Sequence, residues 1–539
     1  MEHNTIVSGS ILIGLILYIV YKRLTRLSLN DIPGPAPESV WLGSMGQLGR
    51  SLVGKVDAAW LEKYGGVVHL KGPFGQDLLW VADGRALSFI FNQGYNFPKT
   101  NERVAFDTLA TDYGLVTTDG DVHKRQRKVM QPAFGAPESK ALFPIFSRCA
   151  ESISAKWRDQ LLDSSGQVSV FNMPTWISNA ALDAIGEAAF DYNFGAINNE
   201  GNDFSRSYQS LMVHAYSSPP DLKIILDSLA RFIPYTVLVF IYDHLPALRM
   251  LHENREEAHK FARQVLADKD AALAKGHHSR DILSILVRAN NSEDASRRMT
   301  ETEMIAQMRA ILLAGHETTS TSLGWGLLEL ARRPEIQSRL RKEIHDIEAI
   351  VKLKGRGINA SDVENMPYLQ AIVKEILRLN PPAYHMQRCS KEDVAIPMSR
   401  PIITKSGKEI REVLVPKGTR IMLSIVGYNR DKTVWGADAL EFNPDRWLDE
   451  KRQSSVQVGV YANLATFSGG VRSCIGWRFA IHEIQAFLIE LVGNFEFTPT
   501  EACRNIRKEP CLIMAPIIEG EKPKGAQIPL KVTLARRET

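Results

Sequence analysis

Apolar residues dominate the start of the chain, where residues 5–21 contain no charged side chain. Lys22, Arg23 and Arg26 follow directly. A run of this length is at the short end of what crosses a bilayer, and basic residues after it place that side in the cytosol. We therefore expect a single membrane anchor followed by a cytosolic chain. The alternative is a cleaved signal peptide, whose basic residues would precede the apolar run.

Beyond this run the spacing of apolar residues alternates between a pattern typical of strands and one typical of helices. Residues 66–83 hold two β-rich runs around a turn containing Gly and Pro, which predicts a hairpin. From about residue 85 to 385 the apolar positions recur mostly at helical spacing, and strand-like segments return at 402–424 and 528–534. The pattern predicts one large, mainly helical domain with a small sheet at one side.

Two short segments suggest more specific hypotheses. Residues 31–37 contain three prolines and should form a stiff, extended hinge after the anchor. Residues 235–242 are apolar, lie between Pro234 and Pro246, and are too short to span a bilayer. Two interpretations of them stay open: a buried helix, or a surface helix that dips into the membrane near a substrate entrance.

The longest helical pattern begins at Thr300, where Thr300 and Glu303 fit a capping box, and ends before Pro334. It is about 33 residues, or roughly 50 Å, long enough to cross the domain. Gly315 lies within it and costs about 1 kcal/mol relative to alanine. Such a glycine indicates a close helix contact, a kink, or a helix that is distorted for function.

Composition narrows the classes of protein. The chain has 539 residues, of which 44% are hydrophobic and 23% charged, as in globular proteins. Its net charge of +4 gives no indication of a nucleic-acid partner. The five cysteines are scattered, without the spacing of a zinc site or a disulfide framework. This distribution fits a reducing compartment in which at most one cysteine has special chemistry.

One cysteine lies in a dense motif, F-x-x-G-x-R-x-C-x-G. Its fixed positions are Phe467, Gly470, Arg472, Cys474 and Gly476. The glycines permit tight turns where a large flat ligand approaches the backbone. The residues after Cys474 read as the start of a helix, and a helix N-terminus together with Arg472 should favour the thiolate. A thiolate is the ligand that a haem iron needs to promote O–O cleavage.

With this motif the sequence resembles the cytochrome P450 family, in its eukaryotic microsomal, fungal-like form. The resemblance covers nearly the whole chain and implies a helical triangular prism with a small β region, preceded by a transmembrane helix. It implies that Cys474 is the axial ligand of haem b, with the other fixed residues of its motif around the cofactor. The expected organisation is an anchor at 1–30, a hinge at 31–48 and a catalytic domain at 49–539.

A second family motif is E-x-x-R, formed by Glu375 and Arg378 in an apolar helical segment. Alone it is a weak signal, because acid–base pairs at this spacing are usually exposed. A charged pair in apolar surroundings must be paired and hydrogen-bonded. The resemblance implies that Arg446 completes a structural triad that holds the Cys474 loop without taking part in chemistry.

The long helix carries a third motif at residues 314–319. The resemblance implies that Thr318 is the hydroxyl that hydrogen-bonds dioxygen, that Glu317 relays protons, and that Ala314 borders the haem. Reductive O–O cleavage consumes two protons in a site otherwise kept dry, which fits this pair of residues.

Three further residues are expected to bind haem propionates. His123 and Arg127 resemble the family's W-x-x-x-R pair, with His123 where tryptophan is usual. An imidazole N–H can still donate to a carboxylate, and Arg127 offers a stronger, charge-assisted bond. Arg388 is a second propionate partner by the same resemblance.

The resemblance also suggests a pocket, a partner and a location. Pocket-lining candidates are Phe106, Leu115, Ala310, Ala314, Tyr384, Met386 and Leu512. Lys124, Arg125 and Lys128 share a helix whose basic face would meet an acidic electron donor. The chain has no nucleotide motif of its own, so electrons should come from NADPH through cytochrome P450 reductase, with cytochrome b5 as a further donor. The implied location is the endoplasmic reticulum membrane, as a single-pass protein.

We expect a monooxygenase that hydroxylates or epoxidises a lipophilic molecule, a terpenoid-like secondary metabolite or a foreign compound. Three alternatives stay open at this point. A P450-type isomerase or dehydratase needs no external electrons, a haem-binding sensor shows no turnover, and a haem-free membrane scaffold shows no haem absorbance.

Overall fold

The structure is a computed structural model that describes residues 27–164, 166–198, 220–275, 280–292, 294, 297–449 and 456–537. The apolar run at 5–21, expected as a membrane anchor, lies outside these residues. Among the helices within them, none is long and apolar enough to cross a membrane.

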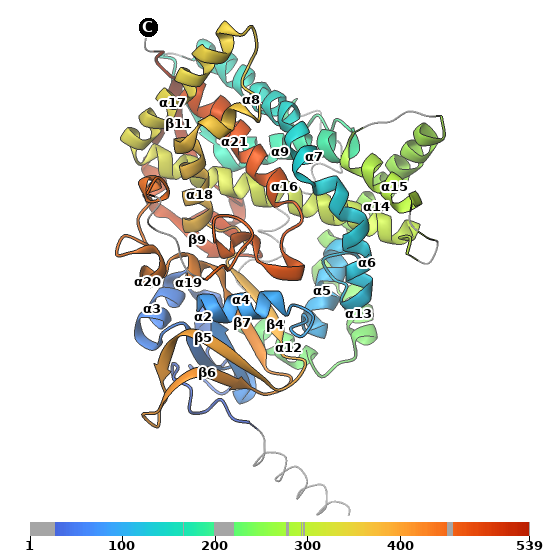
Figure 1. The fold of residues 1–539 in the computed structure, drawn as a ribbon, viewed down its shortest axis with the longest axis vertical. Coiled ribbons are helices and arrows are strands. Elements are labelled where there is room, and N and C mark those ends of the chain that lie inside the picture. The colour runs from blue at the N-terminus through green and yellow to red at the C-terminus, as the bar shows by residue number, and fades with distance from the viewer. Residues whose placement is uncertain are drawn as a thin grey trace, which may run out of the picture.

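Helices form most of the molecule and lie above a β-rich part at the bottom of Figure 1. They are α2 (Met45–Arg50), α3 (Lys55–Tyr64), α4 (Gly84–Asn92), α5 (Asn101–Thr111), α6 (Gly120–Met130), α7 (Ala136–Ala141), α8 (Phe143–Asp163), α9 (Met173–Phe190), α12 (Asp221–Ala230), α13 (Tyr235–His244), α14 (Arg249–Ala274), α15 (Ile282–Ser292), α16 (Glu301–Ala331), α17 (Pro334–Leu353), α18 (Pro367–Leu379), α19 (Ile425–Asn429), α20 (Lys432–Trp435) and α21 (Trp477–Asn494).

The strands lie in four sheets rather than the single small sheet that the sequence pattern predicted. They are β1 (Val67–Lys71), β2 (Asp77–Val81), β3 (Ser169–Asn172), β4 (His385–Cys389), β5 (Val394–Ile403), β6 (Glu409–Val415), β7 (Arg420–Ser424), β8 (Phe495–Pro499), β9 (Ile506–Pro510), β10 (Met514–Ile518) and β11 (Pro529–Leu534). The sheet orders are β1-β2-β7-β4, β5-β6, β3-β11-β8 and β10-β9.

Two of these sheets explain why the single-sheet prediction was wrong. The β1–β2 hairpin is antiparallel, as predicted, and β7 joins β2 in parallel. The C-terminal strand β11 instead pairs with β8 and with β3, a four-residue strand inside the range predicted to be helical. A strand this short gives too few positions for its period to be read from the sequence.

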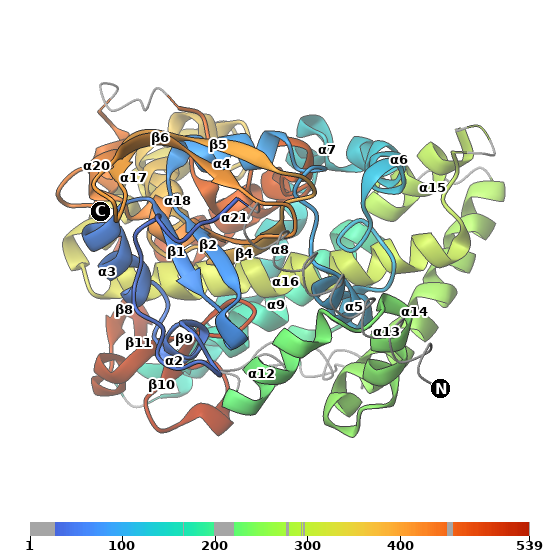
Figure 2. The same cartoon turned by 90° about the horizontal axis from the view of Figure 1, so that it is seen from below.

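Helix α16 is the axis of the helical part and crosses the middle of the molecule in Figure 2. It packs against α9, α21, α14, α5 and α18. The predicted capping box is confirmed: the Thr300 backbone N–H donates to Glu303 Oε2 at 2.9 Å, and the Glu303 N–H donates to Thr300 Oγ1 at 3.2 Å. The helix runs unbroken through Gly315, where a Cβ would lie 2.8 Å from Ile185 Cδ1. Gly315 therefore allows close packing against α9, and the expected distortion is not seen as a break in the helix.

The proline-rich segment packs against the first sheet. The His69 N–H donates to the Pro33 carbonyl at 3.0 Å, and Leu29 and Ile32 are buried. A Cβ on Gly34 would lie 1.8 Å from the His69 carbonyl oxygen, so only glycine permits this approach. The expected boundary between residues 48 and 49 falls inside α2.

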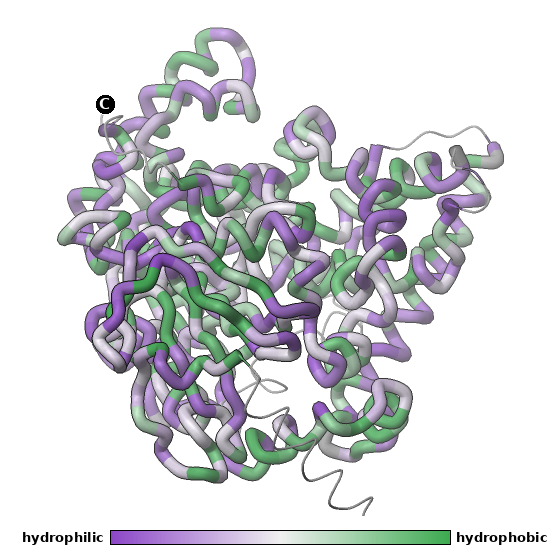
Figure 3. The backbone as a smooth tube through the Cα atoms, turned by 60° about the horizontal axis from the view of Figure 1, so that its bottom comes forward, coloured by the Kyte–Doolittle hydropathy of each residue, from purple (hydrophilic) through white to green (hydrophobic). Residues whose placement is uncertain are grey.

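Residues 235–242 belong to α13, which packs against the protein on one face and is exposed on the other. Leu238 is buried, whereas Val237, Phe240 and Ile241 are exposed. The interpretation as a buried helix is therefore wrong. Figure 3 shows the hydrophobic character of α12 and α13 at the lower side of the molecule.

Candidate functional site

The Cys474 loop is shaped by its backbone. The Cys474 N–H donates to the Phe467 carbonyl at 2.9 Å, closing the loop just before α21. Gly470 has φ +61°, and a Cβ there would lie 2.1 Å from the Phe91 carbonyl oxygen, so no other residue fits. Phe467 is buried, while Cys474 is an exposed residue of the loop. The loop thus exposes Cys474 and buries Phe467, whose carbonyl accepts the Cys474 hydrogen bond.

The electrostatics at Cys474 differ from the prediction in one respect. Burial among protein atoms raises the pKa of the thiol, and the Gly476 N–H and the Arg127 guanidinium oppose this rise. Arg472 was expected to act on the thiol, but its guanidinium pairs with the Asp119 carboxylate and donates to the carbonyls of Gly94 and Thr118. The positive charge that favours the thiolate form of Cys474 is therefore that of Arg127.

Arg127 reaches the loop directly. It donates to the Ser473 carbonyl at 2.8 Å and to Ser473 Oγ at 3.1 Å. Helix α6 is thereby tied to the residue next to Cys474, which fixes the position of the guanidinium.

The α16 motif lies on a stretch of helix that is partly open. Ala314 is exposed although this helix is buried over most of its length, and α21, which Cys474 precedes, packs against α16. Thr318 Oγ1 donates to the Ala314 carbonyl at 2.7 Å, which fixes the hydroxyl along the helix. Glu317 Oε1 lies 3.5 Å from His316 Nε2. The motif therefore combines a held hydroxyl with a partly buried carboxylate.

Cations concentrate near the Cys474 loop. Burial, Arg472 and Arg103 lower the pKa of Arg388 to about 10. Within the described part of the chain, neither Arg388 nor Arg127 has a carboxylate partner; Arg388 donates to the Gln387 carbonyl. The carboxylates that act on this cluster are Asp107, which pairs with Lys99 and Arg103, and Asp119, which pairs with Arg472. The positive charges of Arg127 and Arg388 are therefore not neutralised by a described carboxylate, and each could bind a carboxylate of an anionic ligand.

His123 lies in the same group of cations. It is 2% exposed, and burial together with Arg472, Arg127 and Lys99 lowers its pKa to about 3. The imidazole is therefore neutral at physiological pH. Its Nδ1 lies 2.9 Å from Tyr95 Oη, a contact that no sequence motif indicated.

The Glu375–Arg378–Arg446 triad is brought together in the interior. Arg378 Nε and Nη2 each donate to Glu375 at 2.8 Å, and Arg446 Nε donates to Glu375 Oε1 at 3.0 Å. Arg378 also donates to the carbonyls of Asn429, Ala439 and Glu441. The side chains of Glu375 and Arg378 are fully buried. The triad thus joins α18 to residues 429–446, which precede the Cys474 loop.

Comparison with known proteins agrees with this geometry. The family model for cytochrome P450 matches residues 33–520. Cytochrome P450 monooxygenase 128 of Postia placenta is 31% identical over 96% of this chain and 94% of its own length. Cytochrome P450 monooxygenase claQ of Ampulloclitocybe clavipes is 30% identical over 96% of both chains. A ganoderic acid synthetase of Ganoderma lucidum is 30% identical over 90% of this chain and 91% of its own.

The chain belongs to the cytochrome P450 family. Its relatives of fungal origin are named monooxygenases, and the chain is an enzyme of this class. Membership implies the use of haem and O2 with electrons from a reductase.

The residues predicted to line the substrate pocket of this P450 do not all pack against the same core. Phe106, Leu115, Tyr384 and Leu512 pack against the same hydrophobic core as α16. Met386 packs instead against the core beneath the first sheet. The Leu115 N–H donates to Gln307 Oε1 at 2.9 Å, and Tyr384 Oη donates to the Cys511 carbonyl at 2.7 Å. Ala310 is 6% exposed.

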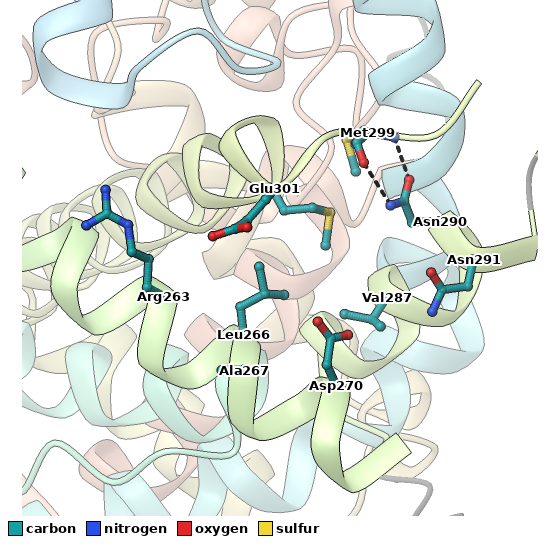
Figure 4. Close-up of a pocket in the computed structure, with 10 residues that line it drawn as sticks. Arg263, Leu266, Ala267, Asp270, Val287, Asn290, Asn291, Met299 and Glu301 are labelled. Atoms are coloured by element: carbon teal, nitrogen blue, oxygen red, sulfur yellow. Dashed lines mark hydrogen bonds between the residues drawn. The ribbon is translucent and has the colours of Figure 1, made fainter. Parts of the chain in front are cut away.

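A separate hollow of about 280 Å³ lies between α14, α15 and the start of α16. Figure 4 shows Asn290 bonded through its side chain to the backbone of Met299, with the carboxylates of Asp270 and Glu301 elsewhere around the hollow. The residues that line this hollow include none of the site residues predicted from the sequence. It is therefore distinct from the region around Cys474.

Proposed function

We propose that this P450 binds haem b through Cys474 and inserts one atom of O2 into a lipophilic substrate by hydroxylation or epoxidation. The observation that carries the proposal is Cys474, an exposed residue held near a group of cations, two of which have no carboxylate partner among the residues that the structure describes. A dianionic ligand with a metal centre matches this donor set.

The residues fit haem in two ways. Cys474 Sγ would ligate the iron, whose positive charge would offset the burial that raises the pKa of the thiol. Arg127, Arg388 and His123 would hold the two propionate carboxylates. Ala314, Phe467, Gly470 and Gly476 would border the ring, and Arg472 would act through its charge on this cluster. When bound, haem supplies the reduction of O2 by two electrons and two protons, which releases one oxygen atom as water.

The reduced, carbon-monoxide-bound difference spectrum of the expressed protein tests this proposal. We expect a red-shifted Soret band, which thiolate ligation produces. An unshifted haem–CO band in gently prepared membranes would contradict Cys474 ligation, and well-folded protein without any haem band would favour the scaffold alternative. Product formation that depends on NADPH and a reductase would exclude the isomerase and sensor alternatives.

Thr318 and Glu317 are proposed as the proton-handling pair. We expect Thr318→Ala to lower product formed per NADPH by about 10²-fold, with peroxide released instead, because a proton donor held at Oγ1 is lost. Thr319→Ala is the matched control, since its hydroxyl bonds the Gly315 carbonyl one position further along the helix. Peroxide and NADPH assays check this, and equal losses in both variants would contradict the assignment.

The electron donor is proposed to be NADPH–cytochrome P450 reductase, with cytochrome b5 as a further donor, docking on the basic face of α6. Lys124 and Lys128 are exposed on this helix. Arg125 was expected there too, but it donates to Glu303 and to the Arg298 carbonyl and is partly buried. The proposed face therefore rests on the two lysines.

The substrate is proposed to be a lipophilic secondary metabolite, such as a terpenoid, or a foreign compound. The printed name of the Ganoderma lucidum relative, a ganoderic acid synthetase, supports a role in secondary metabolism. Screening terpenoids with a reductase present is the direct approach.

We further propose that the protein is an endoplasmic reticulum enzyme with an anchor at 1–30 and a catalytic domain at 49–539, joined by a segment at 31–48 that packs on that domain. An exposed apolar surface supports contact with the bilayer. It comprises Val40, Trp41, Phe74, Leu222, Leu226, Leu229, Phe232, Val237, Phe240 and Ile241. Its parts adjoin, because α12 packs on α2 and on residues 73–75 and the rings of Trp41 and Phe74 lie 5.8 Å apart.

Trp41 offers a test of this membrane contact. It is 63% exposed, whereas most of the nine tryptophans are buried or half-buried. In the full chain reconstituted with brominated lipids, we expect the bromine atoms to quench part of the tryptophan fluorescence, because an interfacial indole lies at their depth. Trp41→Phe should remove this quenched part of the fluorescence. The matched control is Trp477→Phe, beside the Cys474 loop. Quenching that survives Trp41→Phe unchanged would show that this surface stays in water.

A further inference from the structure

His123 is a neutral imidazole in a place where cations gather, so its single ring N–H decides what it can bind. A neutral imidazole has one donor and one acceptor nitrogen. If Nε2 carries the hydrogen, His123 can donate to a carboxylate; if Nδ1 carries it, Nε2 offers only a lone pair. An indole N–H at this position would always donate a hydrogen bond. The imidazole of this chain donates from Nε2 in only one of its two tautomers.

Tyr95 contacts the nitrogen that sets this choice. Its hydroxyl lies 2.9 Å from His123 Nδ1, and the two rings meet edge to face with centroids 5.6 Å apart. A phenol is a better hydrogen-bond donor than acceptor, and an imidazole nitrogen lone pair is a strong acceptor. The favoured arrangement is therefore Tyr95 O–H donating to Nδ1, which leaves the ring hydrogen on Nε2.

Two cations fix the Tyr95 ring. Lys124 Nζ lies 5.1 Å and the Arg472 guanidinium 5.2 Å from the ring centroid. A cation over the face of an aromatic ring is attracted to it, which restrains the orientation of the ring. Arg472 belongs to the Cys474 motif, and Lys124 follows His123 directly in α6. The Tyr95 ring therefore lies between the Cys474 loop and α6.

The other nitrogen of His123 remains available. Within the described residues Nε2 has no hydrogen-bond partner, and it is not sealed from solvent. It lies in the region where Arg127, Arg472 and Lys99 place positive charge. An N–H at this position needs an acceptor, and a carboxylate would be attracted there by the surrounding cations.

We propose that Tyr95 is a positioning residue that holds His123 in the tautomer with hydrogen on Nε2, so that His123 donates to a haem propionate. This inference rests on the proposed function. It explains how the chain keeps a donor at residue 123 although tryptophan is absent there.

A double-mutant cycle in the ferric holoenzyme tests the proposal. Tyr95→Phe removes the hydroxyl and keeps the ring, and we expect about fivefold to tenfold faster haem transfer to apomyoglobin. In the His123→Trp background, where the indole N–H cannot shift, Tyr95→Phe should change the rate by less than about twofold. If His123→Trp does not fold, His123→Lys serves instead, because its ammonium carries only hydrogen-bond donors and no acceptor. Tyr113→Phe, which removes an exposed hydroxyl elsewhere, is the matched control.

A second readout does not depend on haem release. Nitrogen-15 NMR of labelled histidine should show Nδ1 of His123 unprotonated in the parent and a mixture of tautomers in Tyr95→Phe. A purely structural tyrosine would give equal rate changes in both backgrounds and an unchanged tautomer, and that result would overturn the inference. A protein without the red-shifted CO band would overturn the proposed function instead, so the two failures are distinguishable.

Discussion

Cys474→Ala is expected to abolish the red-shifted Soret band of the reduced, CO-bound protein and to remove NADPH-dependent turnover completely. The substitution deletes the sulfur that the loop presents while leaving its backbone bonds in place, because the hydrogen bond to Phe467 comes from the Cys474 N–H. Arg127 would still be tied to Ser473. The loop should therefore keep its shape and lose only its ligand.

The measurement is the CO difference spectrum beside circular dichroism of the same sample. Cys389→Ala is the matched control, because this cysteine is half-buried in β4 and belongs to no motif. We expect its spectrum to equal that of the parent. A red-shifted band that persists in Cys474→Ala would mean that another group ligates the iron.

Arg378→Met is expected to destabilise the protein by about 3–5 kcal/mol, the range for breaking a buried ion pair by removing one partner. Methionine has a similar length but cannot pair with Glu375, and the carbonyls of Asn429, Ala439 and Glu441 would lose their donor. Arg446 alone would then face the Glu375 carboxylate. Since domains typically have only about 5–15 kcal/mol of stability, a loss of this size is a large fraction of the total and should lower the denaturant midpoint strongly.

Denaturant unfolding followed by circular dichroism checks this value. Lys342→Met is the control, because Lys342 and Asp346 form an ion pair at 3.0 Å with both side chains largely exposed. Such surface pairs contribute at most about 1 kcal/mol. Similar losses of stability in the two variants would mean that the buried triad is not the support inferred for residues 429–446.

The sequence predicted best those features that depend on neighbours in the chain. The start of α16 follows from Thr300 and Glu303, which lie three residues apart and form the capping box that their order indicates. The turn of the Cys474 loop follows from Gly470, whose position admits no side chain. The Glu375–Arg378 pair also lies within one helical turn, and its apolar surroundings were visible in the sequence.

Features that depend on distant segments could not be predicted in the same way. Arg472 turns to Asp119 and Arg125 to Glu303, and each pair is brought together by the packing of α6. Tyr95 carries no motif that connects it to His123. The half-exposed α13 has the same apolar residues as a buried helix, and which of its faces is covered depends on what packs beside it.

The order of strands in the β3-β11-β8 sheet has a consequence for biosynthesis. Strand β11 is the central strand and is made last, so β3 and β8 leave the ribosome before the strand that joins them exists. Their edges are open to other chains during that interval. Slow translation of residues 529–534 should therefore favour aggregation, and a fusion partner attached directly after residue 534 would interfere with the closing of this sheet.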